Sequence, residues 1–141
     1  DCFSAPPDDP AKIDERIDRV FAQADKLLAE TRRVAPTAEL GICLVPPPNV
    51  RQEAFTANYQ DRYTRWGWKR IQHQLVQRQI KQFGNRETER IFLIPTELNV
   101  DPVDGYPNNN AVHPNAVGYR QIAESIYAWL KWRLADEDKA K

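Results

Sequence analysis

Two short apolar runs, each stopped by proline, most constrain how this chain can fold. The first run covers residues 40–45 and ends at Pro46–Pro48, and the second covers residues 91–94 and ends at Pro95. Short apolar runs of this kind are typical of strands buried on both faces, as in parallel sheets. We therefore predict two buried parallel strands and expect Cys43, inside the first, to be a small core residue.

Long segments with a helical period flank these runs. Apolar spacings of three and four predict helices over about 10–34, 65–83 and 115–133. Asp9 followed by Pro10 predicts an N-cap, and Gly84 is the expected C′ residue of the second helix. The residues expected to face inward are Ile13, Ile17, Val20, Phe21, Ala24, Leu27 and Leu28, then Trp68, Ile71, Leu75, Ile80 and Phe83, and last Val117, Ile122, Ile126, Trp129 and Leu130.

The predicted order of helix, strand, helix, strand, helix is typical of an α/β fold with right-handed crossovers. Residues 49–64 are expected to form a loop with a short helix, and residues 96–113 a long polar loop. Two strands are too few for a sheet of this type, which usually has about 4–6 strands. Because the chain also contains no methionine and opens with Asp1, we expect residues 1–141 to be the C-terminal part of a longer domain.

Charge and composition exclude several classes of protein. Lys+Arg 20 against Asp+Glu 20 give zero net charge, so the chain has no broad basic field for nucleic acid. Its apolar runs are too short for a membrane-spanning helix. Its two histidines and two cysteines lack metal-ligand spacing, and no glycine-rich phosphate loop is present. We predict no metal or other cofactor, no nucleic-acid partner and no membrane span.

The loop after the second predicted strand is the strongest candidate for a functional site. In open α/β sheets, ligands bind beyond the carboxyl ends of the strands. The loop over residues 96–113 is unusually long and ends with His113 at the start of the last predicted helix. Pro114 favours an extended backbone at His113, and a histidine side chain titrates near neutral pH. We interpret His113 as a general base.

Residues 110–119, which read Asn-Ala-Val-His-Pro-Asn-Ala-Val-Gly-Tyr, resemble the final motif of the SGNH, or GDSL, hydrolases. That motif is Asp-x-x-His, often followed by Pro and a Gly-Tyr pair. The resemblance implies a flavodoxin-like three-layer α/β/α fold, of which residues 1–141 form the C-terminal part, and hydrolysis of small, lipid or acetylated-carbohydrate esters without a cofactor. It also implies a nucleophile from an upstream Gly-Asp-Ser motif, and relatives that are often exported.

Asn110 occupies the position of the family's aspartate, which orients the catalytic histidine and stabilises its charged form. An amide oxygen accepts the same hydrogen bond but brings no negative charge. Asp104 or Asp101, in the same loop, is an alternative acid, and a backbone carbonyl that orients His113 is another. The remaining interpretation of asparagine at residue 110 is that the protein is a weakened enzyme or an inactive carbohydrate-binding relative.

Other residues are candidates for parts of the same site. Asp1 fits the last position of the family's Gly-x-Asn-Asp motif, beside the oxyanion donors. Asn49, Tyr59 and Trp66 follow the first strand and are candidates for substrate binding, although aromatic residues near arginines also pack helices. The serines, Ser4 and Ser125, and the second histidine, His73, lie outside catalytic motifs, and an unrelated interaction module is the competing hypothesis.

Overall fold

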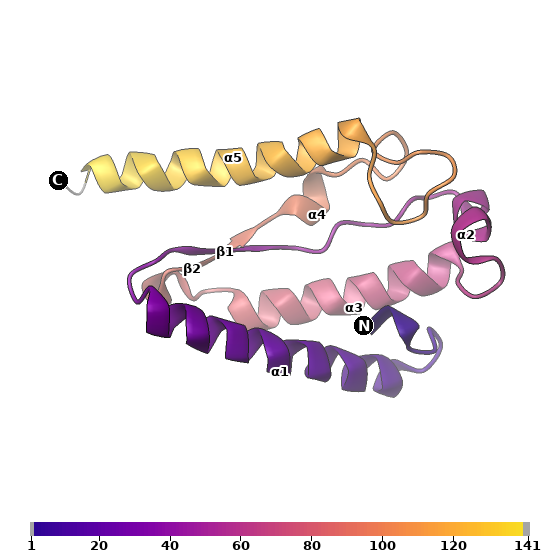
Figure 1. Ribbon diagram of the computed structural model, residues 1–141, viewed down its shortest axis with the longest axis horizontal. Coiled ribbons are helices and arrows are strands. Elements are labelled where there is room, and N and C mark those ends of the chain that lie inside the picture. Colours follow the sequence, from indigo (N-terminus) through magenta and orange to yellow (C-terminus); the bar gives the residue numbers. More distant parts are fainter. Residues whose placement is uncertain (1, 140–141) are drawn as a thin grey trace. The chain divides into compact units, whose positions relative to one another are not determined.

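The computed structural model describes residues 2–139 and contains three long helices and two short strands (Figure 1). It confirms the predicted order of these elements, and adds a one-turn helix, α4, in the segment expected to be a loop. The last helix extends six residues past its predicted end at 133. The elements are η1 Cys2–Ser4, α1 Pro10–Val34, β1 Leu40–Cys43, α2 Gln52–Tyr59, α3 Arg65–Phe83, η2 Glu87–Glu89, β2 Ile91–Ile94, α4 Thr96–Asn99 and α5 Ala116–Lys139.

The two strands pair in parallel, which confirms the mixed α/β class. The Leu40 N–H donates to the Arg90 carbonyl at 2.9 Å, and the Leu44 N–H donates to the Ile94 carbonyl at 3.0 Å. Both strands therefore advance by four residues in the same direction between these bonds. Within the described residues the sheet has these two strands, and the chain divides into two compact units, 2–42 with 66–93 and 43–65 with 94–139.

The strands differ in burial. In β2, Ile91, Phe92 and Ile94 are buried, as predicted. In β1, burial alternates: Leu40 and Ile42 are half-buried, whereas Gly41 and Cys43 are exposed. The prediction that Cys43 is a core residue is wrong, because the two larger aliphatic side chains occupy the covered face of β1 and its small residues fall on the other.

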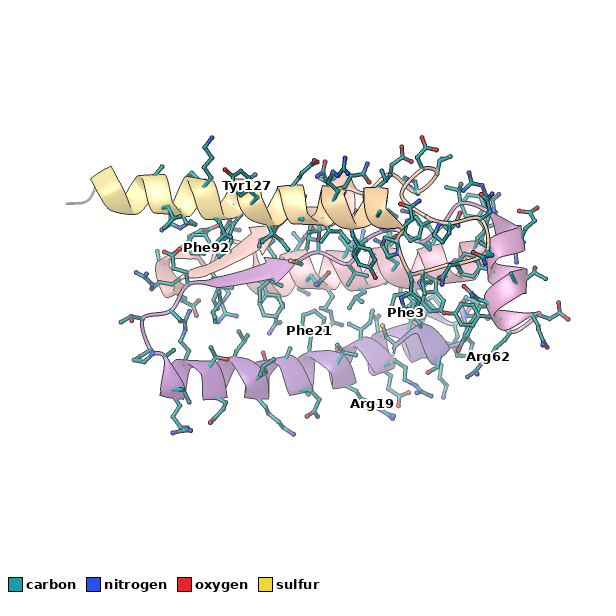
Figure 2. The ribbon with its side chains drawn as sticks, turned by 45° about the horizontal axis from the view of Figure 1, so that its top comes forward. Phe3, Arg19, Phe21, Arg62, Phe92 and Tyr127 are labelled. Carbon is teal, nitrogen blue, oxygen red and sulfur yellow. The ribbon has the colours of Figure 1, made fainter. Side chains whose placement is uncertain are left out.

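The first unit is built around α1 and α3, which lie side by side (Figure 1). Asp9 caps α1, since its carboxylate accepts from the Lys12 N–H at 3.0 Å. Ile17 and Phe21 are buried on the inner side of α1, and the Phe21 ring stacks on the Phe83 ring with centroids 5.6 Å apart. In Figure 2, Phe21 projects from the inner side of α1 and Arg19 from the outer side.

Several residues predicted to face inward are exposed. Val20 and Leu27 on α1, Ile80 on α3, and Val117 and Leu130 on α5 keep between 36% and 68% of their surface exposed. The apolar stripe predicted from the helical period is therefore wider than the stripe that is buried in the structure. On α5, Gly118 and Ser125 are buried, and three of the predicted residues, Ile122, Ile126 and Trp129, are half-buried.

The end of α3 also differs in detail from the prediction. The Gly84 N–H donates to the Ile80 carbonyl at 2.8 Å, but Gly84 itself has a negative φ. The left-handed position is taken by Asn85, with φ of 57°, and asparagine tolerates this conformation better than most residues.

No helix among residues 2–139 is long and apolar enough to cross a membrane.

Candidate functional site

The second unit holds the chain between β2 and α5 in one conformation through side-chain hydrogen bonds to its backbone. We call residues 100–115 of this segment the His113 loop. The chain leaves β2 through α4, whose first residue, Thr96, is fully buried and donates its hydroxyl to the Leu44 carbonyl. The Val50 N–H donates to the Pro102 carbonyl at 3.1 Å, so the first part of the loop is bonded to the segment that follows β1.

Asn49 makes three hydrogen bonds with the loop. Its side chain is buried, and its amide nitrogen donates to the carbonyl of Pro107 at 3.0 Å and to that of Asn110 at 2.9 Å. Its backbone N–H donates to the Ala111 carbonyl at 2.9 Å. The Asn49 side-chain oxygen accepts from the Arg51 N–H at 3.0 Å. Both amide hydrogens are therefore engaged with the loop, and the predicted contact of Asn49 with a substrate stays a prediction.

Tyr106 anchors the middle of the loop. Its ring is buried, and its hydroxyl donates to the Pro47 carbonyl, in the middle of the segment that joins β1 to α2. Burial, with a smaller contribution from nearby Tyr119, raises the pKa of Tyr106 to about 12. The phenol is therefore a neutral donor throughout the physiological pH range.

Two further side chains bind the loop backbone from α2 and from the residue before it. The side-chain oxygen of Asn58, on α2, accepts from the N–H of Ala111 at 2.7 Å, and Ala111 is fully buried. The Arg51 guanidinium donates to the Val103 carbonyl at 2.8 Å. Backbone groups of the loop thus find partners without forming a strand or a long helix.

The loop is joined to α5 by Asn115. The Asn115 side-chain oxygen accepts from the N–H groups of Val117 at 2.8 Å and Gly118 at 3.1 Å, which is the bonding of a helix N-cap. Its amide nitrogen donates to the Asp104 carbonyl at 2.8 Å, and its backbone N–H donates to the Gly105 carbonyl at 2.9 Å. A single residue therefore begins the helix and fixes the preceding turn to it.

His113 lies at the exposed end of this fixed segment, two residues before the N-cap of α5. The position agrees with the prediction of a histidine at a helix start. Its ring makes no hydrogen bond or ion pair with any residue in the described part of the chain. The imidazole is therefore held by its backbone and is open to solvent and to a ligand.

Asn110, at the position of the family's aspartate, is bonded to backbone rather than to the His113 ring. Its side-chain oxygen accepts from the N–H of Val112 at 3.1 Å and from the N–H of His113 at 2.9 Å. This bonding is an Asx turn, a common role for asparagine. Asn110 thus fixes the backbone on which the His113 ring is carried, and the ring nitrogens are left for other partners.

The two alternative acids have different surroundings. One carboxylate oxygen of Asp101 accepts from the N–H groups of Val103 at 2.7 Å and Asp104 at 3.2 Å, so Asp101 forms its own Asx turn. The Asp104 side chain is exposed and makes no hydrogen bond or ion pair among residues 2–139. Neither carboxylate bonds to the His113 ring in this structure.

The aromatic candidates fall in different units. Tyr59, at the end of α2, is half-buried in contact with Phe55 and with Tyr63, whose ring centroid is 5.1 Å away. Burial first, and then Tyr63, raises the pKa of Tyr59. Trp66, in the first turn of α3, is 66% exposed and belongs to the first unit. The predicted role of Asp1 falls outside the described residues.

Three residues that organise the loop were missed in the sequence. Tyr106, Asn58 and Gln121 carry no motif, and their partners lie 20 to 59 residues away along the chain. Gln121, on α5, accepts from the Asp101 N–H at 2.9 Å through its side chain. The role of Asn115 could be predicted from the sequence, because asparagine directly before a helix is a favoured N-cap residue.

The serines of the chain lie in other surroundings. The Ser4 hydroxyl accepts from Arg16 at 3.3 Å in the first unit, and the Ser125 hydroxyl donates to the Gln121 carbonyl at 3.3 Å within α5. No group of three or more metal-ligating side chains is gathered among residues 2–139. No model of a known protein family, no curated protein and no solved structure matches the chain.

Proposed function

We propose that this chain carries the general base of an SGNH-type esterase and forms the C-terminal part of its flavodoxin-like domain. The observation that carries the proposal is the position of His113. Its side chain is exposed, and hydrogen bonds from several elements hold the backbone around it. It lies between the carboxyl end of β2 and the N-terminus of α5. In α/β sheets this is where ligands bind.

In the proposed reaction, the His113 ring takes the proton of a serine hydroxyl as the serine oxygen attacks the ester carbonyl. The same ring then gives that proton to the departing alcohol, and the cycle repeats with water on the acyl-enzyme. Orientation of the ring comes from the fixed backbone, through the bond between the His113 N–H and Asn110. Charge stabilisation from an aspartate is absent at residue 110.

The serine has to come from outside these 141 residues. Ser125 is nine residues beyond the start of α5, which corresponds to about 14 Å along the helix. Its hydroxyl is bonded to the helix backbone. Ser4 is bonded to Arg16 and has no Gly-Asp-Ser context. The proposal therefore requires a longer polypeptide that supplies the nucleophile and the oxyanion donors.

The test is hydrolysis of p-nitrophenyl acetate by the full-length protein. His113→Ala should lower kcat by a factor of about 10³ or more, as expected for loss of a general base in a triad. The matched control is His73→Ala, because His73 is an exposed histidine on α3 that bonds to Gln77. Equal activity of the wild-type and His113→Ala proteins would reject the proposal.

Asn110→Asp is the complementary variant. A carboxylate can accept both backbone hydrogen bonds and adds the negative charge that residue 110 lacks. The acid-to-amide change in the worked serine-protease example lowers kcat by about 10⁴, so the reverse change here should raise kcat. Unchanged or lower activity, with the fold intact, would show that the acid is supplied elsewhere, and Asp104→Asn then tests that source.

A second candidate function is carbohydrate binding without catalysis. Two observations favour it: residue 110 is uncharged, and Trp66 is 66% exposed, as in aromatic platforms that stack on sugar rings. Its test is binding of acetylated polysaccharide to the full-length protein and to Trp66→Ala. Binding that is lost in this variant, in a protein without esterase activity, would favour the second function over the first.

A further inference from the structure

The helix α5 has apolar residues on two opposite sides. Its covered side runs through Gly118, Ile122, Ser125 and Trp129, which are buried or half-buried. Residues two positions apart on a helix point in nearly opposite directions, so Tyr127 projects away from this side (Figure 2). We call the exposed apolar residues on that side the outer stripe; they are Tyr119, Ala123, Tyr127, Leu130 and Leu134.

The outer stripe has the pattern of a helix-packing face. Its members are spaced by three or four residues over about 23 Å of helix. Tyr119, Tyr127, Leu130 and Leu134 are between 44% and 67% exposed. Scattered exposed apolar residues are ordinary, but a continuous stripe opposite the covered side of a helix is typical of an interface.

Three exposed charged residues, Arg120, Glu124 and Lys131, lie along one edge of this stripe, and the last two carry opposite charges. Glu124 and Lys131 are exposed and are seven residues apart, so they lie on the same edge two turns from each other. Neither makes an ion pair or hydrogen bond with another residue in the part of the chain that the structure describes. Tyr127, at the centre of the stripe, lies between them along the helix.

We propose that the outer stripe of α5 packs against the same stripe of a second copy of this chain, with the two helices antiparallel. A two-fold axis between Tyr127 and Ala128 places Glu124 of each copy opposite Lys131 of the other, so both ion pairs form at once. A parallel pairing would instead place Glu124 against Glu124. The charges therefore favour an antiparallel pair of identical helices.

The expected dimer is weak and reversible. One helix face is smaller than a standard interface, which buries about 800 Å² on each partner, so we expect a Kd of about 1–100 µM. Each copy contributes two tyrosines to the interface, and this residue type provides a large contact area at low entropic cost. The pairing is independent of the proposed esterase activity, because it uses none of the residues assigned to that site.

Sedimentation velocity of the full-length protein over a concentration series tests the proposal. The wild-type protein should be a monomer–dimer mixture. Glu124→Lys and Lys131→Glu should each weaken the dimer by about tenfold, because each converts two attractive contacts into two repulsive ones. The double variant Glu124→Lys with Lys131→Glu should restore the wild-type Kd. Tyr127→Ala should abolish dimerisation.

Lys26→Glu is the matched control, because it reverses an exposed charge on α1, outside the stripe. It should leave the Kd unchanged. A monomeric wild-type protein would overturn the proposal, as would a dimer that tolerates both single charge reversals. Failure of the double variant to recover dimerisation, with its helix content unchanged by circular dichroism, would reject the antiparallel register.

Discussion

Gly105 and Gly118 approach each other so closely that neither position has room for a methyl group. A Cβ atom at Gly118 would lie 2.3 Å from the Gly105 carbonyl oxygen and 2.7 Å from the Cβ of Pro114. A Cβ atom at Gly105 would lie 2.4 Å from the Asp101 carbonyl oxygen and 3.3 Å from the Cα of Gly118. Both glycines have negative φ, so space rather than backbone conformation requires them.

Gly118→Ala should therefore destabilise the protein, although alanine favours a helix. The added methyl group forces the loop away from α5, and overpacking of this kind costs about 1–3 kcal/mol. The free energy of unfolding from urea denaturation measures the effect. Gly41→Ala, at an exposed glycine in β1, is the control and should change stability by less than about 0.5 kcal/mol. A stabilised Gly118→Ala variant would contradict the close approach.

Asn49→Ala should loosen the His113 loop. The substitution removes the donor to the carbonyls of Pro107 and Asn110 and leaves these groups without their buried partner. We expect a loss of about 2–4 kcal/mol and faster amide hydrogen exchange at residue 111, whose neighbours lose their anchor. The contrary outcome is unchanged exchange at Ala111 and His113, which would mean that the other contacts hold the loop without Asn49.

Asn49→Asp provides a pH-dependent version of the same experiment. A buried carboxylate at this position would face two carbonyl oxygens within about 3 Å, so the new side chain should bind a proton and have a raised pKa. A group with a raised pKa in the folded state stabilises that state at low pH and loses this contribution as pH rises. Asn49→Asp should therefore lose stability relative to Asn49→Ala between pH 4 and pH 7, and parallel pH profiles of the two variants would refute this.

Tyr106 should make the protein sensitive to alkali. Its pKa is raised to about 12 in the folded state and is near 10 in an unfolded chain. The stabilising contribution is complete below pH 10 and is lost as pH rises through about 12, and it amounts to about 2–3 kcal/mol. Tyr106→Phe should remove this dependence, with a cost of about 1 kcal/mol at pH 7 for the lost bond to Pro47.

Unfolding free energies between pH 9 and pH 12 measure this difference. Tyr127→Phe is the control, because Tyr127 is 67% exposed and its hydroxyl makes no hydrogen bond within residues 2–139. The control should follow the wild-type pH profile. If Tyr106→Phe also follows that profile, the Tyr106 phenol is not buried as described.

The core of the first unit should respond to truncation in proportion to burial. Ile17 is fully buried on α1, whereas Val20, one turn later, is 36% exposed. Ile17→Ala should cost about 2–5 kcal/mol because it leaves a cavity, and Val20→Ala should cost less than about 1 kcal/mol. Thermal unfolding of the two variants provides the comparison. Equal losses would show that the apolar stripe of α1 is covered over its full predicted width.

Local signals in the sequence were sufficient for the three long helices and the two strands. Asp9 and Pro10 predicted the start of α1, and the run at residues 91–94 predicted β2, because capping and apolar runs act over a few residues. Cys43 was misplaced because burial depends on which face of a strand its neighbours cover. The same reason applies to Ile80, which fits the helical period but is 48% exposed on α3.

The candidate site was only partly predictable. His113 and Asn110 were found because they lie in one short motif, and the loop ending at His113 was recognised by its length. The residues that hold this loop could not be found in the same way, because Tyr106 bonds to Pro47 and Asn58 bonds to Ala111 across more than 50 residues of sequence. Such pairs leave no local pattern in one sequence.

The many bonds to the backbone of the His113 loop have a practical consequence for digestion experiments. A protease binds several residues of flexible chain in its active-site cleft, and exposed loops usually provide such residues. Between Asp101 and Asn115, the carbonyls of Pro102, Val103, Asp104, Gly105, Pro107, Asn110 and Ala111 are already engaged. The His113 loop should therefore resist cleavage by proteases, although it contains neither a strand nor a long helix.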